Sequence, residues 1–203
     1  MNFSSNKKFW FLVCTYLILT ISDMVLTYID KPKLPYETYL FASVMSSLGW
    51  STLIIGWIFI NTLISVVYVL LVYYSFVKYQ RLIIECEGIK QYVSMLMFDR
   101  PDKFSWIWWK FPPNKATLMR AIAPIGFGIA YSFIIFQALC VVEWIGIIYE
   151  SRLIYWYFQN INIFPPLVSV IVMVLSFLIF YTYWFYKEYK INQNELMLKD
   201  SKL

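Results

Sequence analysis

Four long apolar blocks constrain the fold of this chain more than any other feature of its sequence. They cover residues 9–29, 39–77, 118–149 and 164–186. A helix needs about 20 consecutive apolar residues to cross the hydrocarbon core of a bilayer. The first and last blocks therefore fit one crossing each, whereas the second block is nearly long enough for two.

The distribution of basic residues decides how often the chain crosses. If each block crosses once and the N-terminus is cytoplasmic, 14 of the 17 basic residues lie on the cytoplasmic side, and only Lys31, Lys33 and Arg152 lie outside. A fifth crossing would move the basic loop to the side opposite the N-terminus, against the positive-inside rule. We therefore predict a single all-α integral membrane domain with four transmembrane helices and with cytoplasmic N- and C-termini. The expected crossings are residues 9–29, 51–77, 118–149 and 164–186.

The composition supports the membrane class and removes several chemistries. The chain is 61% hydrophobic and 14% charged, whereas soluble domains carry roughly 25% charged residues. It contains no histidine, which is the usual haem ligand and the commonest general base. Its three cysteines lie far apart and form no CxxC pair, and we find no nucleophile, metal or phosphate-binding motif. We therefore expect no catalytic site, no cofactor and no metal site.

Two of the apolar blocks contain helix-disturbing residues. Gly49 allows either a short outer-face helix over residues 39–48 or one long tilted helix, and the sequence leaves both open. In the third block, Pro124 predicts a kink. Gly126 and Ala130 are four residues apart, a spacing of small side chains that predicts a helix-packing seam.

The polar loop between the second and third crossings carries a helical pattern. Apolar residues recur at 4-3-4-3 spacing over residues 82–98, which predicts a cytoplasmic amphipathic helix. This helix could lie on the bilayer, continue the second crossing or dock against a partner subunit. The polar tail after residue 186 predicts a short helical extension of the last crossing.

The stretch FSWIWWKFPPNK interleaves aromatic and basic residues just before the third crossing. This composition is typical of single-stranded nucleic-acid binding and also of the membrane–water interface. Because a basic surplus beside the crossings already follows from the orientation, we predict an interfacial anchor over residues 104–113 and no nucleic-acid partner. Its principal residues are Trp106, Trp108, Trp109 and Lys110.

Two carboxylates and one asparagine inside the expected crossings are candidate functional residues. Asp23 and Glu143 lie toward the outer ends of the first and third crossings, and Asn61 lies near the middle of the second. Ionisable residues at membrane depth are candidate functional groups, because burying a charge there is unfavourable. They could form an outward-facing carboxylate site. The simpler interpretation, which we favour, is that Asp23 accepts hydrogen bonds from nearby groups while Glu143 extends toward water.

Together these patterns predict a non-catalytic membrane subunit that packs with partner proteins and lipid. The expected partners are membrane lipids and either other membrane proteins or further copies of the chain. The alternative is a small oligomeric transporter or channel that uses Asp23 and Glu143. The expected location is the plasma membrane of a prokaryote, although the sequence does not distinguish it from an organelle membrane.

Overall fold

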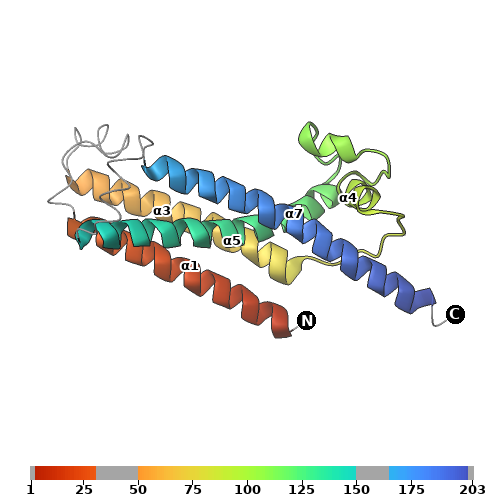
Figure 1. The fold of residues 1–203 in the computed structure, drawn as a ribbon, viewed down its shortest axis with the longest axis horizontal. Helices are drawn as coiled ribbons and strands as arrows, with labels where there is room; N and C mark the ends of the chain where they lie inside the picture. The colour runs from red at the N-terminus through yellow and green to blue at the C-terminus, as the bar shows by residue number, and fades with distance from the viewer. Residues whose placement is uncertain (1–2, 31–49, 150–164, 201–203) are drawn as a thin grey trace. The chain divides into compact units, whose positions relative to one another are not determined.

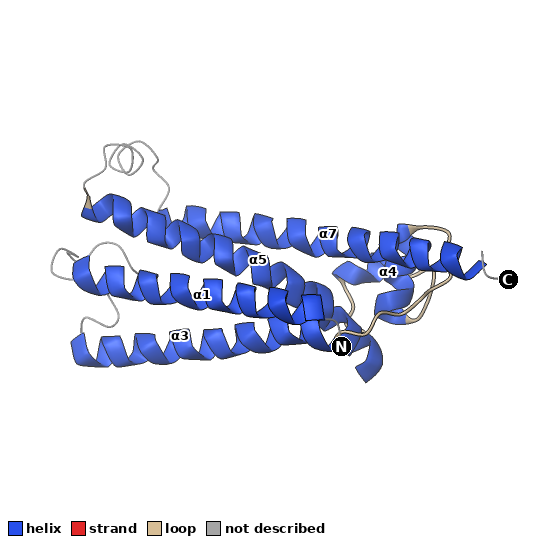
Figure 2. Cartoon of the chain, turned by 90° about the horizontal axis from the view of Figure 1, so that it is seen from below, coloured by secondary structure: helices blue, strands red, loops and turns tan. Residues whose placement is uncertain are grey.

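A computed structural model describes residues 3–30, 50–149 and 165–200 (Figure 1). Within these ranges the regular structure is entirely helical and contains no strand (Figure 2). There are four long helices in the described ranges, and a π-helical turn and two short helices lie between the second and third of them. The long helices are α1 (Phe3–Asp30), α3 (Trp50–Tyr73), α5 (Lys115–Ile148) and α7 (Pro165–Asp200). The short ones are α4 (Ile89–Phe98) and the 3₁₀ helix η4 (Phe104–Trp108).

The long helices confirm the predicted all-α architecture. Within the described residues, four helical stretches are apolar enough to cross a membrane and reach the length of about 20 residues that the hydrocarbon core requires. They are Asn6–Leu26, Ile58–Lys78, Lys115–Ile148 and Val168–Lys199. The second stretch ends in a π-helical turn, η3 (Tyr74–Lys78). Residues 39–48, for which the sequence left a separate outer-face helix and a long tilted helix both open, lie outside the described residues.

The chain divides into two compact units, and each of the four long helices contributes residues to both. The first unit takes its described residues from Met1–Phe11, Leu71–Ser132 and Val174–Leu203. The second takes them from Leu12–Leu70 and Phe133–Met173. In the second unit, Tyr16 stacks on Tyr68 with ring centroids 3.9 Å apart, and Phe133 lies 6.1 Å from Tyr68.

The first unit has a buried core in which α4 packs against residues of α5 and α7. Phe98 and Leu96 of α4 are buried in the same cluster as Phe127 of α5 and Trp184 of α7. The apolar face of α4 is therefore covered by the chain itself, and α4 does not continue the second crossing. The buried residues of this cluster are Tyr92, Val93, Leu96, Met97, Phe98, Ala121, Ala123, Phe127, Trp184 and Phe185.

The helix predicted over residues 82–98 is wrong for its first seven residues. The chain is not helical from Tyr79 to Cys86, and α4 begins at Ile89 after an extended Gly88 with φ −163°. Glycine lowers helix stability, and side chains of α7 bind the backbone of this stretch in place of helical hydrogen bonds. We call residues 79–88 the docked segment.

The C-terminal part of the chain is more helical than predicted. The expected short extension of the last crossing is instead a continuous helix that reaches Asp200. At the start of α5, Asn114 and Thr117 cap the helix reciprocally: the Thr117 N–H donates to Asn114 Oδ1 at 2.8 Å, and the Asn114 N–H donates to Thr117 Oγ1 at 3.2 Å. Helix α5 then runs through Pro124 without interruption.

Candidate functional site

The docked segment is held by polar side chains of α7 in the first unit. Asn192 is 2% exposed, and its amide forms two hydrogen bonds of 2.8 Å with the backbone of Ile84, accepting from the N–H and donating to the C=O. Gln193 Nε2 donates to the carbonyl oxygen of Cys86 at 3.3 Å. These contacts satisfy backbone groups that a helix would otherwise have paired.

An ion pair also joins α7 to the docked segment. The Arg81 guanidinium donates to both carboxylate oxygens of Glu188, from Nε at 2.7 Å and from Nη2 at 3.2 Å. The Glu188 side chain is 6% exposed, whereas the Arg81 side chain is 43% exposed. The hydrogen bonds that Arg81 donates to Glu188 raise the pKa of the guanidinium further, so Arg81 stays charged at any physiological pH. Glu195 lies at 3.9 Å on the other side of the guanidinium.

Three titratable groups beside this ion pair are held in their neutral forms. Burial raises the pKa of the Tyr79 and Tyr92 phenols above their ordinary value, and it also raises the pKa of the Cys86 thiol. A neutral thiol is a poor nucleophile and a poor metal ligand. The arrangement is therefore suited to holding the docked segment in place, and it offers little for covalent or acid–base chemistry.

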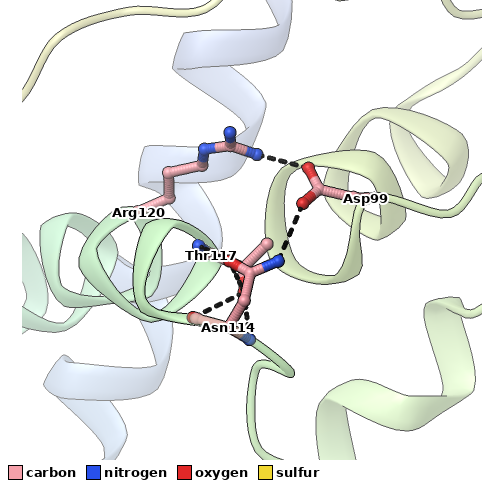
Figure 3. A network of polar contacts seen from close by, with 4 residues as sticks. All are labelled: Asp99, Asn114, Thr117 and Arg120. Carbon is pink, nitrogen blue, oxygen red and sulfur yellow. Dashed lines mark hydrogen bonds and ion pairs between the residues drawn. The ribbon is translucent and has the colours of Figure 1, made fainter.

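A second polar network ties the end of α4 to the start of α5 (Figure 3). Asp99 caps α4 in the left-handed conformation, with φ 54°. Its carboxylate accepts a hydrogen bond from Arg120 Nη1 at 2.6 Å and another from Asn114 Nδ2 at 3.2 Å. Because Asn114 also caps α5, this network fixes both ends of the loop that contains η4.

The aromatic stretch before α5 separates into buried and exposed parts. Trp106 packs edge-to-face on Phe98 of α4, with centroids 5.8 Å apart, and Lys110 Nζ lies 3.9 Å from its ring centroid. Trp109 and Phe111 are 86% and 91% exposed. Of the residues predicted to form the anchor, Trp106 contributes to the α4 core, Trp109 is free to reach an interface, and the Trp108 side chain lies outside the described residues.

The two predicted intramembrane carboxylates come together in the second unit. Asp23 of α1 accepts a hydrogen bond from the Trp144 side chain and lies within electrostatic range of Glu143. Glu143 in turn accepts a hydrogen bond from Ser169 Oγ of α7 at 2.7 Å. Sequence reasoning did not identify Trp144 and Ser169 as the groups that bind these carboxylates. Asn61 of α3 is half-buried.

Two glycines of α5 lie at close helix approaches in the first unit. A Cβ atom added to Gly126 would stand 2.3 Å from the Leu71 carbonyl oxygen of α3, which is closer than two such atoms can approach. A Cβ atom at Gly128 would meet the Phe177 ring at 2.9 Å. Ala130, the other residue of the predicted seam, is fully buried. Ser75 Oγ also donates to the Ala123 carbonyl oxygen at 2.7 Å, which adds a polar contact between the second and third spans.

The sequence contained one usable signal for the residues that hold the docked segment. Glu188, Asn192 and Glu195 follow one another at spacings of four and three, which places them on one face of a helix. A polar stripe of this kind on a helical tail indicates a docking face. It does not indicate what docks there, because the Ile84 backbone lies 108 residues away in the chain.

Comparison with known protein families, characterised proteins and solved structures found no significant match. The class therefore follows from the structure: the regular structure of the described residues is all helical, and four of their helices are long and apolar enough to span a membrane, as in a multi-pass membrane protein. Among the described residues, no group of three or more cysteine, aspartate or glutamate side chains could hold a metal ion.

Proposed function

We propose that this protein is a non-catalytic subunit of a larger membrane assembly, in which it packs against partner proteins and lipid. The observation that carries this proposal is the unpaired apolar surface of α3. Of the span Ile58–Lys78, 17% is buried inside the chain, the same share as for Val168–Lys199, against 28% for Asn6–Leu26 and 33% for Lys115–Ile148. A surface of this kind has to be covered by lipid or by other apolar helices. Its exposed residues include Ile55, Ile58, Phe59, Leu63, Val66, Val67 and Leu70.

The state of the polar groups supports a structural role. In the first unit, the buried Glu188 and Asn192 are both committed to the docked segment, and the thiol and phenols nearby stay neutral. Polar groups that satisfy one another rigidify a fold and leave little capacity for substrate. A rigid module of this type beside membrane-spanning helices fits a packing subunit.

We also propose that both termini and the α4 region face the cytoplasm. The first unit gathers the start of α1, the α4 region and the end of α7, which supports a common side for all three. Phe9 near the N-terminus, for example, lies 5.6 Å from the Tyr73 ring at the end of α3. The basic residues concentrated in these parts of the chain favour the inside for that side, and a plasma membrane is the location we propose.

Purification from native membranes in mild detergent tests the subunit hypothesis. Wild-type protein is expected to carry other membrane proteins in a fixed ratio. The double variant Phe59→Ala/Leu63→Ala, on the exposed face of α3, is expected to lose them. A matched control on α1, Phe11→Ala/Ile18→Ala, also removes two exposed apolar side chains and is expected to keep them. If all three proteins retain the same partners, the contact is not on α3.

A second candidate function, a small oligomeric transporter or channel, is favoured by one observation. Asp23 and Glu143 interact in the second unit, and each accepts a hydrogen bond from a neighbouring side chain. Paired carboxylates at membrane depth are typical of proton and cation pathways. If the chain transports an ion, Asp23→Asn and Glu143→Gln abolish flux in reconstituted vesicles without changing assembly. Unchanged flux in both variants rules this candidate out.

A further inference from the structure

Three cationic side chains converge on the ring of Trp106. Lys110 Nζ lies 3.9 Å from the ring centroid, Lys103 Nζ lies 5.2 Å from it, and the Arg100 guanidinium carbon lies 5.9 Å from it. No two of these groups can therefore be more than about 11 Å apart. Like charges this close repel one another, and an anion bound between them offsets that repulsion.

The backbone around these cations is fixed by hydrogen bonds. The fully buried Ser94 of α4 donates through Oγ to the Arg100 carbonyl oxygen at 2.5 Å, and the same Oγ accepts from the Lys103 N–H at 2.8 Å. The Lys110 N–H donates to the Trp106 carbonyl oxygen at 2.8 Å. The convergence of the three cations is thus set by the fold of the α4 region and by Trp106, which itself packs on Phe98.

The neighbouring carboxylates leave part of this charge uncompensated. Asp102 pairs with Lys103, and Asp99 pairs with Arg120 and Asn114. Among the described residues, neither Arg100 nor Lys110 forms an ion pair with a carboxylate. The cluster therefore offers two cations to an external anion.

Two exposed aromatic side chains are the neighbours of Lys110 in the chain, and helix α5 begins shortly after them. Trp109 and Phe111 stand on either side of Lys110 and are almost fully exposed. Helix α5 begins at Lys115, four residues after Phe111, so even an extended chain separates them by no more than about 14 Å. Tryptophan and phenylalanine at this distance from a crossing insert at the headgroup level.

We infer that Arg100 and Lys110 bind the phosphate of an anionic phospholipid, with Trp109 and Phe111 inserted beside it. This inference rests on the proposed membrane function and names the lipid class that the α4 region would recognise. A lipid fits better than a soluble anion because the same surface combines uncompensated positive charge with exposed aromatic rings. A free phosphate ion would bind to the positive charge but would gain nothing from the exposed aromatic rings.

Native mass spectrometry of the full chain in detergent tests the site with short-chain phosphatidylglycerol and phosphatidylcholine as probes. Wild-type protein is expected to prefer phosphatidylglycerol. The double variant Arg100→Gln/Lys110→Gln is expected to lose about tenfold or more of that preference, since each basic residue near an anionic surface contributes severalfold to binding. Arg100→Lys/Lys110→Arg, which keeps both charges, is expected to retain it.

A matched control comes from α7. Lys187 lies 5.8 Å from the Phe127 ring and Lys190 lies 5.7 Å from the Tyr186 ring, so each of these lysines contacts a ring of its own. Lys187→Gln/Lys190→Gln removes the same net charge and is expected to change the preference less than threefold. An equal loss in the two double variants would mean that only overall charge matters, and it would overturn the site.

Inorganic phosphate distinguishes the two sources of the anion. At millimolar concentration it is expected to leave the bound phosphatidylglycerol in place, because it gains nothing from the aromatic side chains. Displacement of the lipid by phosphate would overturn the lipid assignment in favour of a free-anion site. Neither result depends on whether other proteins copurify with the chain, so failure of the subunit proposal would be seen separately.

Discussion

Glu188 on α7 and Arg81 in the docked segment form a two-point ion pair, with hydrogen bonds of 2.7 and 3.2 Å between residues 107 positions apart. The carboxylate is almost completely buried, while the guanidinium is partly open to solvent. Losing the guanidinium would leave an unpaired buried charge, whereas losing the carboxylate would leave a cation that can still be hydrated. The two halves of the pair therefore do not contribute equally to stability.

Arg81→Ala is expected to lower the free energy of unfolding of the first unit by about 2 kcal/mol, because Glu188 loses its hydrogen-bond donors. The double variant Arg81→Met/Glu188→Leu is expected to be destabilised less, since it leaves no buried charge. Unfolding in mixed micelles, followed by circular dichroism, measures both. Lys190→Ala on the exposed side of α7 serves as the control. If Arg81→Ala were no less stable than Lys190→Ala, the result would contradict a stabilising role for the ion pair.

Asn192→Ala is expected to release the docked segment, because it removes both hydrogen bonds to the Ile84 backbone. The expected loss is roughly 1–3 kcal/mol, the range for buried polar groups left without partners. Hydrogen exchange at the Ile84 amide gives a local measurement and is expected to become much faster. Asn194→Ala changes an exposed asparagine two residues away and is expected to leave that rate unchanged. Equal exchange rates of the Ile84 amide in the two variants would contradict the role of Asn192 in holding the docked segment.

Cys86 is expected to react with iodoacetamide more slowly than an ordinary thiol at pH 8. Burial raises its pKa, so less of the reactive thiolate is present at that pH, and the rate is expected to rise only at higher pH. The raised pKa of Cys86 also makes stability depend on pH. Because the fold favours the neutral thiol, its contribution to the free energy of unfolding is fully present below the ordinary pKa of cysteine. This contribution is lost as pH rises through the pKa of Cys86 in the folded state.

The measurement uses a variant in which Cys14 and Cys140 are replaced by serine, so that only Cys86 reacts. Adding Asn192→Ala is expected to speed the reaction and to move its pH profile toward that of a free cysteine. A Cys86 rate that already matches a free thiol in the otherwise native chain would contradict the burial argument.

Gly126→Ala is expected to destabilise the contact between α3 and α5 by roughly 1–3 kcal/mol, the usual range for overpacking. The added Cβ would meet the Leu71 carbonyl oxygen, and backbone at this point can move only if the helices separate. Gly128→Ala is expected to have a smaller effect, since the Phe177 ring that it meets can rotate away. The free energy of unfolding of both variants is measured in mixed micelles. If Gly128→Ala were the more destabilised variant, the close approach of Gly126 to Leu71 would not be the tighter of the two contacts.

The four spans were predictable because membrane insertion depends on the apolar character of about 20 neighbouring residues, a property that hydropathy reports directly. The docked segment was not predictable in the same way. Leu82 and Cys86 follow a helical spacing, yet the backbone between them is bound by Asn192, and that competition depends on a distant part of the chain. Local periodicity cannot reveal a partner of this kind.

The candidate sites show a similar division. Sequence placed Asp23 and Glu143 at comparable depth, and the structure brings them into electrostatic range, but Trp144 and Ser169 were identified only from the fold. In the aromatic stretch before α5, composition predicted the same interfacial role for Trp106, Trp108 and Trp109. The packing of Trp106 on Phe98 separates it from the exposed Trp109, and this depends on how α4 docks.

The most direct test of the central claim is the mass of the protein component extracted from native membranes in mild detergent, measured by light scattering with the chains identified by mass spectrometry. A subunit is expected to yield a mass well above the 24.3 kDa of this chain, made up by other membrane proteins in a fixed ratio. A monodisperse particle that contains this chain alone would contradict the claim. If that particle were also oligomeric, it would favour the transporter.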